Sequence, residues 1–320
     1  GGPFRLTHHK HDPRQMPPAC LARAMNAASR RAFIAPFAAL AIAGSALAAP
    51  ALRPLDPDTC DVIRRYDARE DLPSFRDQFI HMALGTELCE DRAAYCARDH
   101  ILRRESGVSF WYLRLRSWEG RKELRRQIGL AMEEAFGVIF DTLEMTPQDD
   151  FEIVTSEFDS ARFPVIGMML SDYSERQIAL NSIFERAPNF LSPAKRKLLL
   201  AARKGCFVLT SEDEFSRGSP SISLIFLDFN LPEELLVRCA KEEVYNAFLP
   251  GDPIGDASLF DDPWGREAPA DPAQGPGFSE RDRALLRLLY TPDLRAGMPR
   301  AAMEAAVDHV LARDCGIAGP

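Results

Sequence analysis

Histidine is scarce in this chain, and the histidines it has do not pair. After residue 48 only His81, His100 and His309 remain, and none of them lies four residues from another. A catalytic zinc ion normally takes neutral nitrogen or thiolate donors, often two histidines one helical turn apart. A serine triad needs a histidine base, and nothing in the sequence marks one of these three for that role. The sequence therefore lacks the motifs of the commonest hydrolases.

Three further absences narrow the possible functions. After residue 48 no two cysteines have the Cys-x-x-Cys spacing of a zinc or redox site, and Gly275-Pro276-Gly277 follows no strand, so it is not a phosphate loop. Basic residues are also few: without residues 1–48 the chain holds 33 Lys and Arg against 46 Asp and Glu, a formal charge of −13. Such a surface repels nucleic acid and anionic lipid, so we expect neither as a partner.

The front of the chain resembles an export signal. Arg30 and Arg31 precede an Ala-rich apolar run at 32–47, and Ala46-Leu47-Ala48 has the small-x-small form of a cleavage site. We predict a signal peptide at 25–48, either a twin-arginine or an ordinary secretory signal, preceded by upstream residues 1–24. The run is too short for a comfortable membrane span, so we expect a periplasmic or secreted protein without membrane insertion after cleavage.

Six cysteines remain after the signal, an even number that indicates disulfides in an exported protein. We favour Cys206 with Cys239, because the first opens a strand that leads into the helix carrying the second. Cys89 and Cys96 are expected to close a small loop, although on one unbroken helix they would lie too far apart to bond. Cys60 and Cys315 are the remaining pair.

Hydrophobic periodicity predicts an α+β domain over residues 72–315, preceded by a Pro-rich linker at 49–71. Its sheet is expected to be small, mixed and twisted. It packs against a long helix and a Glu-bearing helix, and the C-terminus is helical. A loop at 261–278, low in apolar residues, is expected to be flexible. The predicted helices are 72–88, 120–143 with an apolar stripe that begins at Leu124, 174–204 in pieces, 230–248, 279–290 and 299–313, and the predicted strands are 108–115, 151–155, 206–210 and 221–229. A charged turn at 211–220 is expected to join the last two strands, and the run Ser279-Glu280-Arg281-Asp282 is expected to cap the helix at 279–290.

The helix predicted at 230–248 has one charged residue at a position where its pattern calls for an apolar side chain. We expect Asn230 to cap this helix and Glu233 to reach back to the cap. Its apolar stripe includes Leu236 and Val244, yet Glu243 falls inside the same stripe. A buried carboxylate is costly unless it is paired or hydrogen-bonded, so Glu243 is either a functional group or a core residue bonded to a backbone group or an arginine.

Several runs resemble an exported bacterial family of unknown function, the domain-of-unknown-function family 2927. The resemblance spans about residues 72–312, and its most specific part is the last run. It implies an exported protein and supplies no activity. The runs that carry it are FIHMALGTE at 79–87, CAKEEVYNAF at 239–248, ASLF at 257–260 and RALLRLLYTPDLRAGM at 283–298.

The order of elements also resembles the zincin metalloproteases, whose His-Glu-x-x-His motif lies on a helix after the sheet. On this chain the Glu of the motif falls on Glu243, the two His positions on Glu242 and Asn246, and the third ligand near Asp252. This set does not suit zinc, whereas its oxygen donors would suit calcium or magnesium. Asp252 is also explained by turn chemistry.

Three hypotheses follow, and none of them requires a cofactor. The first is a non-catalytic, zincin-like pseudoenzyme whose cleft binds a peptide or an envelope protein, with an antiparallel edge strand accepting an extended segment. The second is a peptidase-like hydrolase in which Glu243 acts as general base, with or without a metal held by Glu242, Asn246 and Asp252. The third is a structural envelope protein in which Glu243 is a satisfied core residue.

Overall fold

The computed structural model describes one compact unit within Ala46–Pro320, and the other unit, Gly1–Ser45, lies outside the described residues. The predicted signal peptide and the upstream residues therefore lie wholly outside the described residues. The described residues are 52–85, 97–105, 109–113, 121–145, 152–154, 165–171, 173–186, 205–213, 216–228, 230–251 and 278–319, together with 193, 196, 197, 200 and 254.

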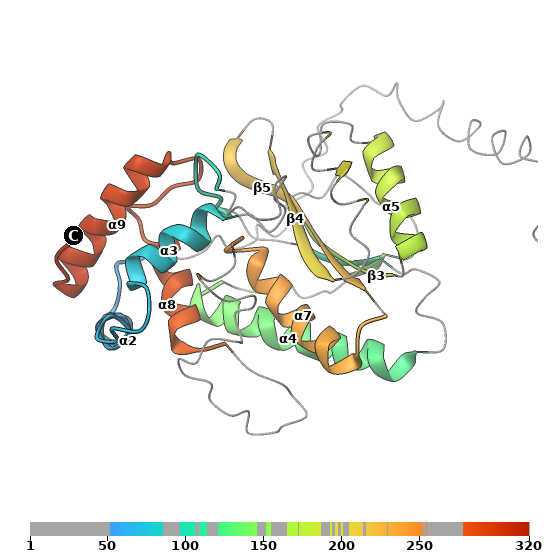
Figure 1. The fold of residues 1–320 in the computed structure, drawn as a ribbon, viewed down its shortest axis with the longest axis horizontal. Coiled ribbons are helices and arrows are strands. Elements are labelled where there is room, and N and C mark those ends of the chain that lie inside the picture. The colour runs from blue at the N-terminus through green and yellow to red at the C-terminus, as the bar shows by residue number, and fades with distance from the viewer. Residues whose placement is uncertain are drawn as a thin grey trace, which may run out of the picture. The chain divides into compact units, whose positions relative to one another are not determined.

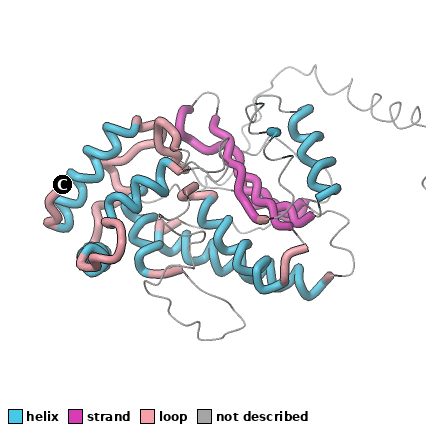
Figure 2. Tube along the Cα trace, viewed as in Figure 1, coloured by secondary structure: helices cyan, strands magenta, loops and turns pink. Residues whose placement is uncertain are grey.

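Five strands form one small mixed sheet in the order β2-β1-β3-β5-β4. Neighbouring strands are parallel, except that β4 runs antiparallel to β5 at one edge. The strands gather on one side of the unit with helices beneath them (Figure 2). Their bounds are β1 Ser109–Leu113, β2 Glu152–Val154, β3 Val165–Ser171, β4 Cys206–Asp213 and β5 Ser216–Asp228.

Helices cover both sides of this sheet (Figure 1). α7 (Glu233–Asn246) packs on β4 and β5, and α4 (Lys122–Thr142) packs on α7. α5 (Tyr173–Arg186) contacts β3 from the opposite side. The stripe of α4 is buried from Leu124 to Ile139, as its 3.6-residue period predicts. The prediction of an α+β fold with a mixed sheet, a long helix and a Glu-bearing helix is confirmed.

The remaining four helices form a second cluster, in which α2 contacts α3, α8 and α9. α8 begins with the predicted capping box, in which the side chains of Ser279 and Asp282 each accept the other's backbone amide. α9 ends at Gly316, whose φ of +67° forms a left-handed cap. The bounds are α2 Pro57–Asp67, α3 Phe75–Leu84, α8 Glu280–Leu289 and α9 Arg300–Cys315.

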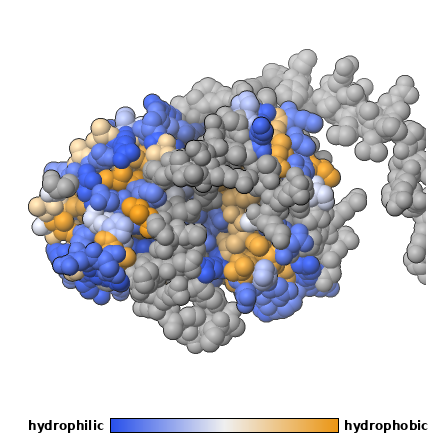
Figure 3. All heavy atoms as spheres, viewed as in Figure 1, coloured by the Kyte–Doolittle hydropathy of each residue, from blue (hydrophilic) through white to orange (hydrophobic). Residues whose placement is uncertain are grey.

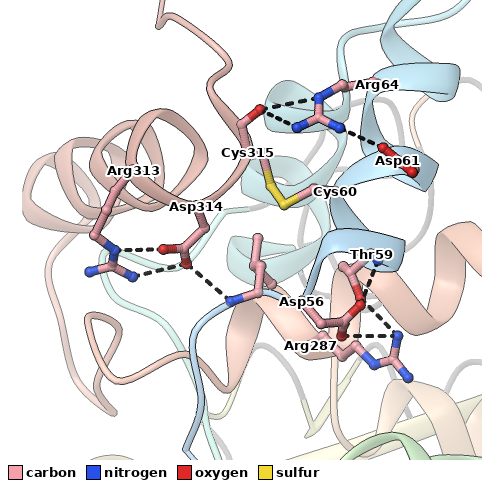
Figure 4. The surroundings of a disulfide bond; sticks show 10 residues. Asp56, Thr59, Cys60, Asp61, Arg64, Arg287, Arg313, Asp314 and Cys315 are labelled. Atoms are coloured by element: carbon pink, nitrogen blue, oxygen red, sulfur yellow. Dashed lines mark hydrogen bonds and ion pairs between the residues drawn. A yellow bond between two sulfur atoms is a disulfide. The ribbon is translucent and has the colours of Figure 1, made fainter.

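The prediction of a linker over 49–71 is wrong for residues 57–67. Residues 57–67 form α2, which is joined to α9 by the Cys60–Cys315 disulfide (Figure 4). One of the prolines that suggested a linker, Pro57, occupies the first turn of this helix, where no amide bond is lost, and Asp56 caps the helix. Val62, Ile63 and Tyr66 then bury one face.

A short segment, 97–105, connects the sheet to the helical cluster. Ile101 donates its amide to Met298 O at 3.1 Å, and Arg103 donates its amide to Gly218 O at 2.9 Å. Gly218 has a φ of +78°, and a Cβ there would lie 1.8 Å from the amide nitrogen of Gly297. The loop before α9 and the start of β5 are therefore in direct backbone contact, which leaves no room for a side chain at position 218.

Other predictions differ from the structure in detail. The strand β3 was not predicted, and the turn predicted at 211–220 is shorter, because β4 continues to Asp213 and β5 starts at Ser216. Apart from Phe278, the loop predicted at 261–278 lies outside the described residues, as do Cys89 and Cys96. Among the helices that the structure describes, none is long and apolar enough to cross a bilayer.

Candidate functional site

The Glu-bearing helix α7 leaves the sheet directly after β5. Its first residue follows Pro232, which makes no side-chain cap bond, so the cap predicted at Asn230 does not form. Instead, Asn230 donates both its amide and its side-chain Nδ2 to Asp228 Oδ1, each at 3.0 Å. This turn at the end of β5 fixes the direction in which α7 starts beneath the sheet.

Three of the four predicted site residues lie together on the C-terminal half of α7. Glu242, Glu243 and Asn246 are all buried, with exposed fractions of 9, 4 and 1%. Glu242 and Asn246 are one turn apart, the spacing that the zincin resemblance implies. The fourth, Asp252, lies outside the described residues. The burial predicted for Glu243 from its position in the stripe is therefore correct, and the burial extends to both of its neighbours.

The other sides of α7 are held by polar contacts to two helices. Lys241 Nζ lies 2.7 Å from Glu134 Oε2 on α4. Tyr245 donates its hydroxyl to Asp282 O at 2.8 Å, and burial, with the nearby carboxylate of Asp282, raises the pKa of Tyr245 well above its usual value. Asp282 is itself paired with the buried guanidinium of Arg281 at 2.8 Å. Such anchoring leaves little freedom for the helix to move.

The C-terminal end of α7 carries a buried cation that the sequence analysis missed. Arg104 donates Nε to Ala247 O at 3.0 Å, bonds the hydroxyl of Ser223 on β5, and lies over the ring of Phe248. Burial lowers the pKa of Arg104 to about 10. A positive charge suits the negative end of the helix dipole, so Arg104 joins α7 to the sheet through 97–105.

The edge strand β4 is fastened to α7 by the Cys206–Cys239 disulfide, whose Cα atoms are 5.9 Å apart. The second expected pair, Cys60–Cys315, also forms, with its Cα atoms 5.0 Å apart. Both pairings are those that the sequence favours. The first of them fixes the start of β4 above the helix that carries Glu243.

Within the described residues β4 pairs only with β5, so its other side is the outer edge of the sheet. Asp228 donates its amide to Gly205 O at 3.3 Å, so these two residues form a hydrogen-bonded pair of the antiparallel ladder. Such pairs alternate with pairs that are not hydrogen-bonded, so they recur at every second residue of β4 after Gly205. The backbone groups of Leu209 therefore face β5. Those of Val208 and Thr210 point toward the outer edge of the sheet, away from β5.

The C-terminal end of β4 contacts a cluster of charged side chains that the sequence did not predict. His100 Nε2 lies 2.8 Å from Glu212 Oε2, and its Nδ1 bonds Asp99. Arg217 bonds Asp99 too, and these two contacts, His100 first, hold the pKa of Asp99 below its usual value. Gly218 donates its amide to Glu212 Oε2 at 2.9 Å. The cluster fixes the end of the hairpin on segment 97–105.

The described residues provide no metal centre. In the ranges that the structure covers, no group of three or more His, Cys, Asp or Glu is arranged to hold an ion. Glu242, Glu243 and Asn246 offer only oxygen donors from one helix, which does not fit zinc. A general base on α7 would have to act from a buried position, since Glu243 is 4% exposed.

Comparison with known proteins adds no relative. No family model, no curated protein and no solved structure matches this chain. The resemblance to the exported family and the resemblance to zincins therefore rest on the residues quoted above.

Proposed function

We propose that this chain is an exported, zincin-like protein that binds an extended peptide by strand addition to the outer edge of β4. The observation that carries the proposal is the position of β4, an antiparallel strand at the edge of a mixed sheet. An added peptide would form main-chain hydrogen bonds with outward backbone groups of β4 such as those of Thr210, and the side chains beside the strand would select its sequence.

The disulfide supports this assignment. An edge strand that must accept a partner has to be held in the extended conformation beforehand, because ordering it during binding costs affinity. Cys206 lies at the start of β4 and Cys239 in the middle of α7, so their bond fixes the strand to the helix beneath. The two disulfides also suit an oxidising compartment, in agreement with the proposed export.

The scaffold supports binding more than catalysis. α4, the sheet and the Glu-bearing α7 follow the order of elements that the zincin resemblance implies. Where that motif has histidines, this chain has Glu242 and Asn246, both buried. The acidic formal charge favours a neutral or basic peptide over an acidic one.

The test uses an array of random eight-residue peptides probed with the purified full chain. We expect binders whose selected side chains alternate along the peptide, and we expect binding to be lost when every second peptide amide is N-methylated. Methylation of the other amides should have little effect, since only alternate amides face the strand. Binding that tolerates methylation at both sets of positions would contradict strand addition.

A pair of variants examines the same edge from the protein side. Thr210→Pro removes an outward amide, whereas Thr210→Val removes the side-chain hydroxyl, which lies 2.8 Å from Ser223 Oγ, and keeps the amide. Peptide binding should fall in the proline variant and persist in the valine variant. Melting temperatures of both variants show whether a loss of binding comes from unfolding.

The hydrolase alternative is tested with the same peptides. If the array peptides are cleaved and the cleavage disappears in Glu243→Gln, then α7 is catalytic and the binding proposal is wrong. Metal analysis of the chain purified without chelator adds a second readout: one equivalent of metal, lost in Glu243→Ala, would also favour the hydrolase.

A further inference from the structure

A second site is indicated away from the sheet, in a groove between α2 and α8. A cavity of about 730 Å³ lies between these helices, within the size range of small-molecule sites. Its walls combine polar and apolar surface, and Figure 3 shows hydrophilic side chains over α2. Four arginines line it, two from each helix: Arg64, Arg65, Arg283 and Arg287.

Three of these arginines are engaged in holding the fold together. Arg64 donates Nη2 to Cys315 O at 2.8 Å, beside the disulfide (Figure 4). Arg65 pairs with Glu280 at 2.7 Å. Arg287 donates Nη1 to Thr59 Oγ1 at 2.8 Å, and the same nitrogen lies 3.5 Å from Asp56 Oδ2, while its Nε and Nη2 make no bond among the described residues.

Arg283 differs from the other three. Its one ion pair in the described part of the chain is a loose approach of 3.9 Å to Asp141, whose side chain is 80% exposed. Arg283 also lies one turn from Arg287 on the same helix face, where two like charges destabilise the helix. An oxyanion between them would remove this repulsion and use guanidinium donors that are otherwise left to water.

The opposite wall restricts what can bind. Asp58, on α2, lines the same groove and has no ion pair or hydrogen bond to other described residues. A carboxylate there repels ligands with negative charge throughout and favours ligands with hydrogen-bond donors at that end.

We propose that the groove between α2 and α8 binds a small solute that carries one phosphate or carboxylate, held by Arg283 and Arg287, and hydroxyl or ammonium donors that reach Asp58. This site is independent of the peptide edge of β4. Because residues 49–320 carry a formal charge of −13, the groove would be a local exception to the repulsion of anions.

The test is calorimetric titration of the full chain at constant ionic strength with three probes: inorganic phosphate, glycerol phosphate and glycerate. Saturable binding of glycerol phosphate would assign a phosphate ligand, and saturable binding of glycerate a carboxylate ligand. Inorganic phosphate should bind more weakly than glycerol phosphate, because it has no hydroxyl-bearing chain that extends from the arginines to Asp58. Absence of saturable binding for all three probes would overturn the proposal.

Three variants locate the bound probe. Arg283→Gln should weaken binding by about tenfold or more, the size expected for one charge-assisted contact, without affecting the fold. Arg126→Gln, an exposed arginine on α4 paired only with neighbours on its own helix, changes the net charge equally and should leave binding unchanged. Asp58→Asn should tighten inorganic phosphate. An equal loss in both arginine variants would show simple charge attraction and refute the site.

Discussion

The two disulfides close loops of very different length, and this predicts unequal losses of stability when each is removed. Cys60 and Cys315 are separated by 255 residues, and Cys206 and Cys239 by 33. In the chain-entropy model, closing these loops in the unfolded state stabilises the protein by about 5.5 and about 4 kcal/mol at 25 °C. Because Cys60 and Cys315 are also fully buried, their replacement adds a packing cost that the half-buried second pair does not share.

The experiment replaces each pair with alanines and measures equilibrium unfolding in urea by tryptophan fluorescence and circular dichroism. We expect the variant lacking Cys60–Cys315 to lose at least about 1.5 kcal/mol more than the variant lacking Cys206–Cys239. Its m-value should also rise more, because the unfolded chain expands further without the longer cross-link. Equal losses, or a larger loss for the shorter loop, would refute the entropic reasoning.

Three glycines and one ion pair give further predictions. Gly218→Ala should cost about 3 kcal/mol, because its φ is +78° and a Cβ would collide with backbone, whereas Gly316→Ala, with a φ of +67° and open space, should cost about 1 kcal/mol in the same urea assay. Gly137→Ala, inside α4 with nothing within 4 Å, should raise the melting temperature through a gain of about 0.5–1 kcal/mol. The bond from Arg313, then that from the Leu55 amide, lowers the pKa of Asp314, so its contribution is present above the unfolded pKa and lost as pH falls through the lower native value. Asp314→Asn should therefore be less stable than the native chain at pH 7, and the difference should shrink below about pH 4; a constant difference would disprove the assignment.

Local patterns in the sequence predicted the elements whose signals are strong. The capping box at Ser279 located the start of α8 correctly, and the long stripe from Leu124 located α4 to within two residues. β3, which pairs in parallel with β1 and β5, was missed because its sequence is a nearly continuous apolar run, typical of parallel strands, without the alternation that marks a strand with one exposed face. α2 was missed because Pro57 reads as a breaker unless the cap at Asp56 is recognised.

The candidate site was predictable only in part. Periodicity placed Glu243 on the buried face of its helix, as the structure has it. No periodicity could reveal Arg104 at the end of α7 or His100 beside Glu212, since these contacts join residues more than a hundred positions apart. Pairing of distant charges depends on tertiary packing, and a single sequence carries no signal of it.

The Cys60–Cys315 disulfide, which joins α2 to α9, has a consequence for how the chain folds during synthesis. The first described helix to be synthesised, α2, contacts its neighbour α3 but packs mainly against α8 and α9, the last two, so most of its burial waits until almost the whole chain is made. During that interval Cys60 can pair with whichever thiol arrives next, and Cys315 arrives last. Vectorial oxidation would then trap wrong bonds, and correct maturation would depend on a disulfide isomerase or on oxidation delayed until the chain is complete.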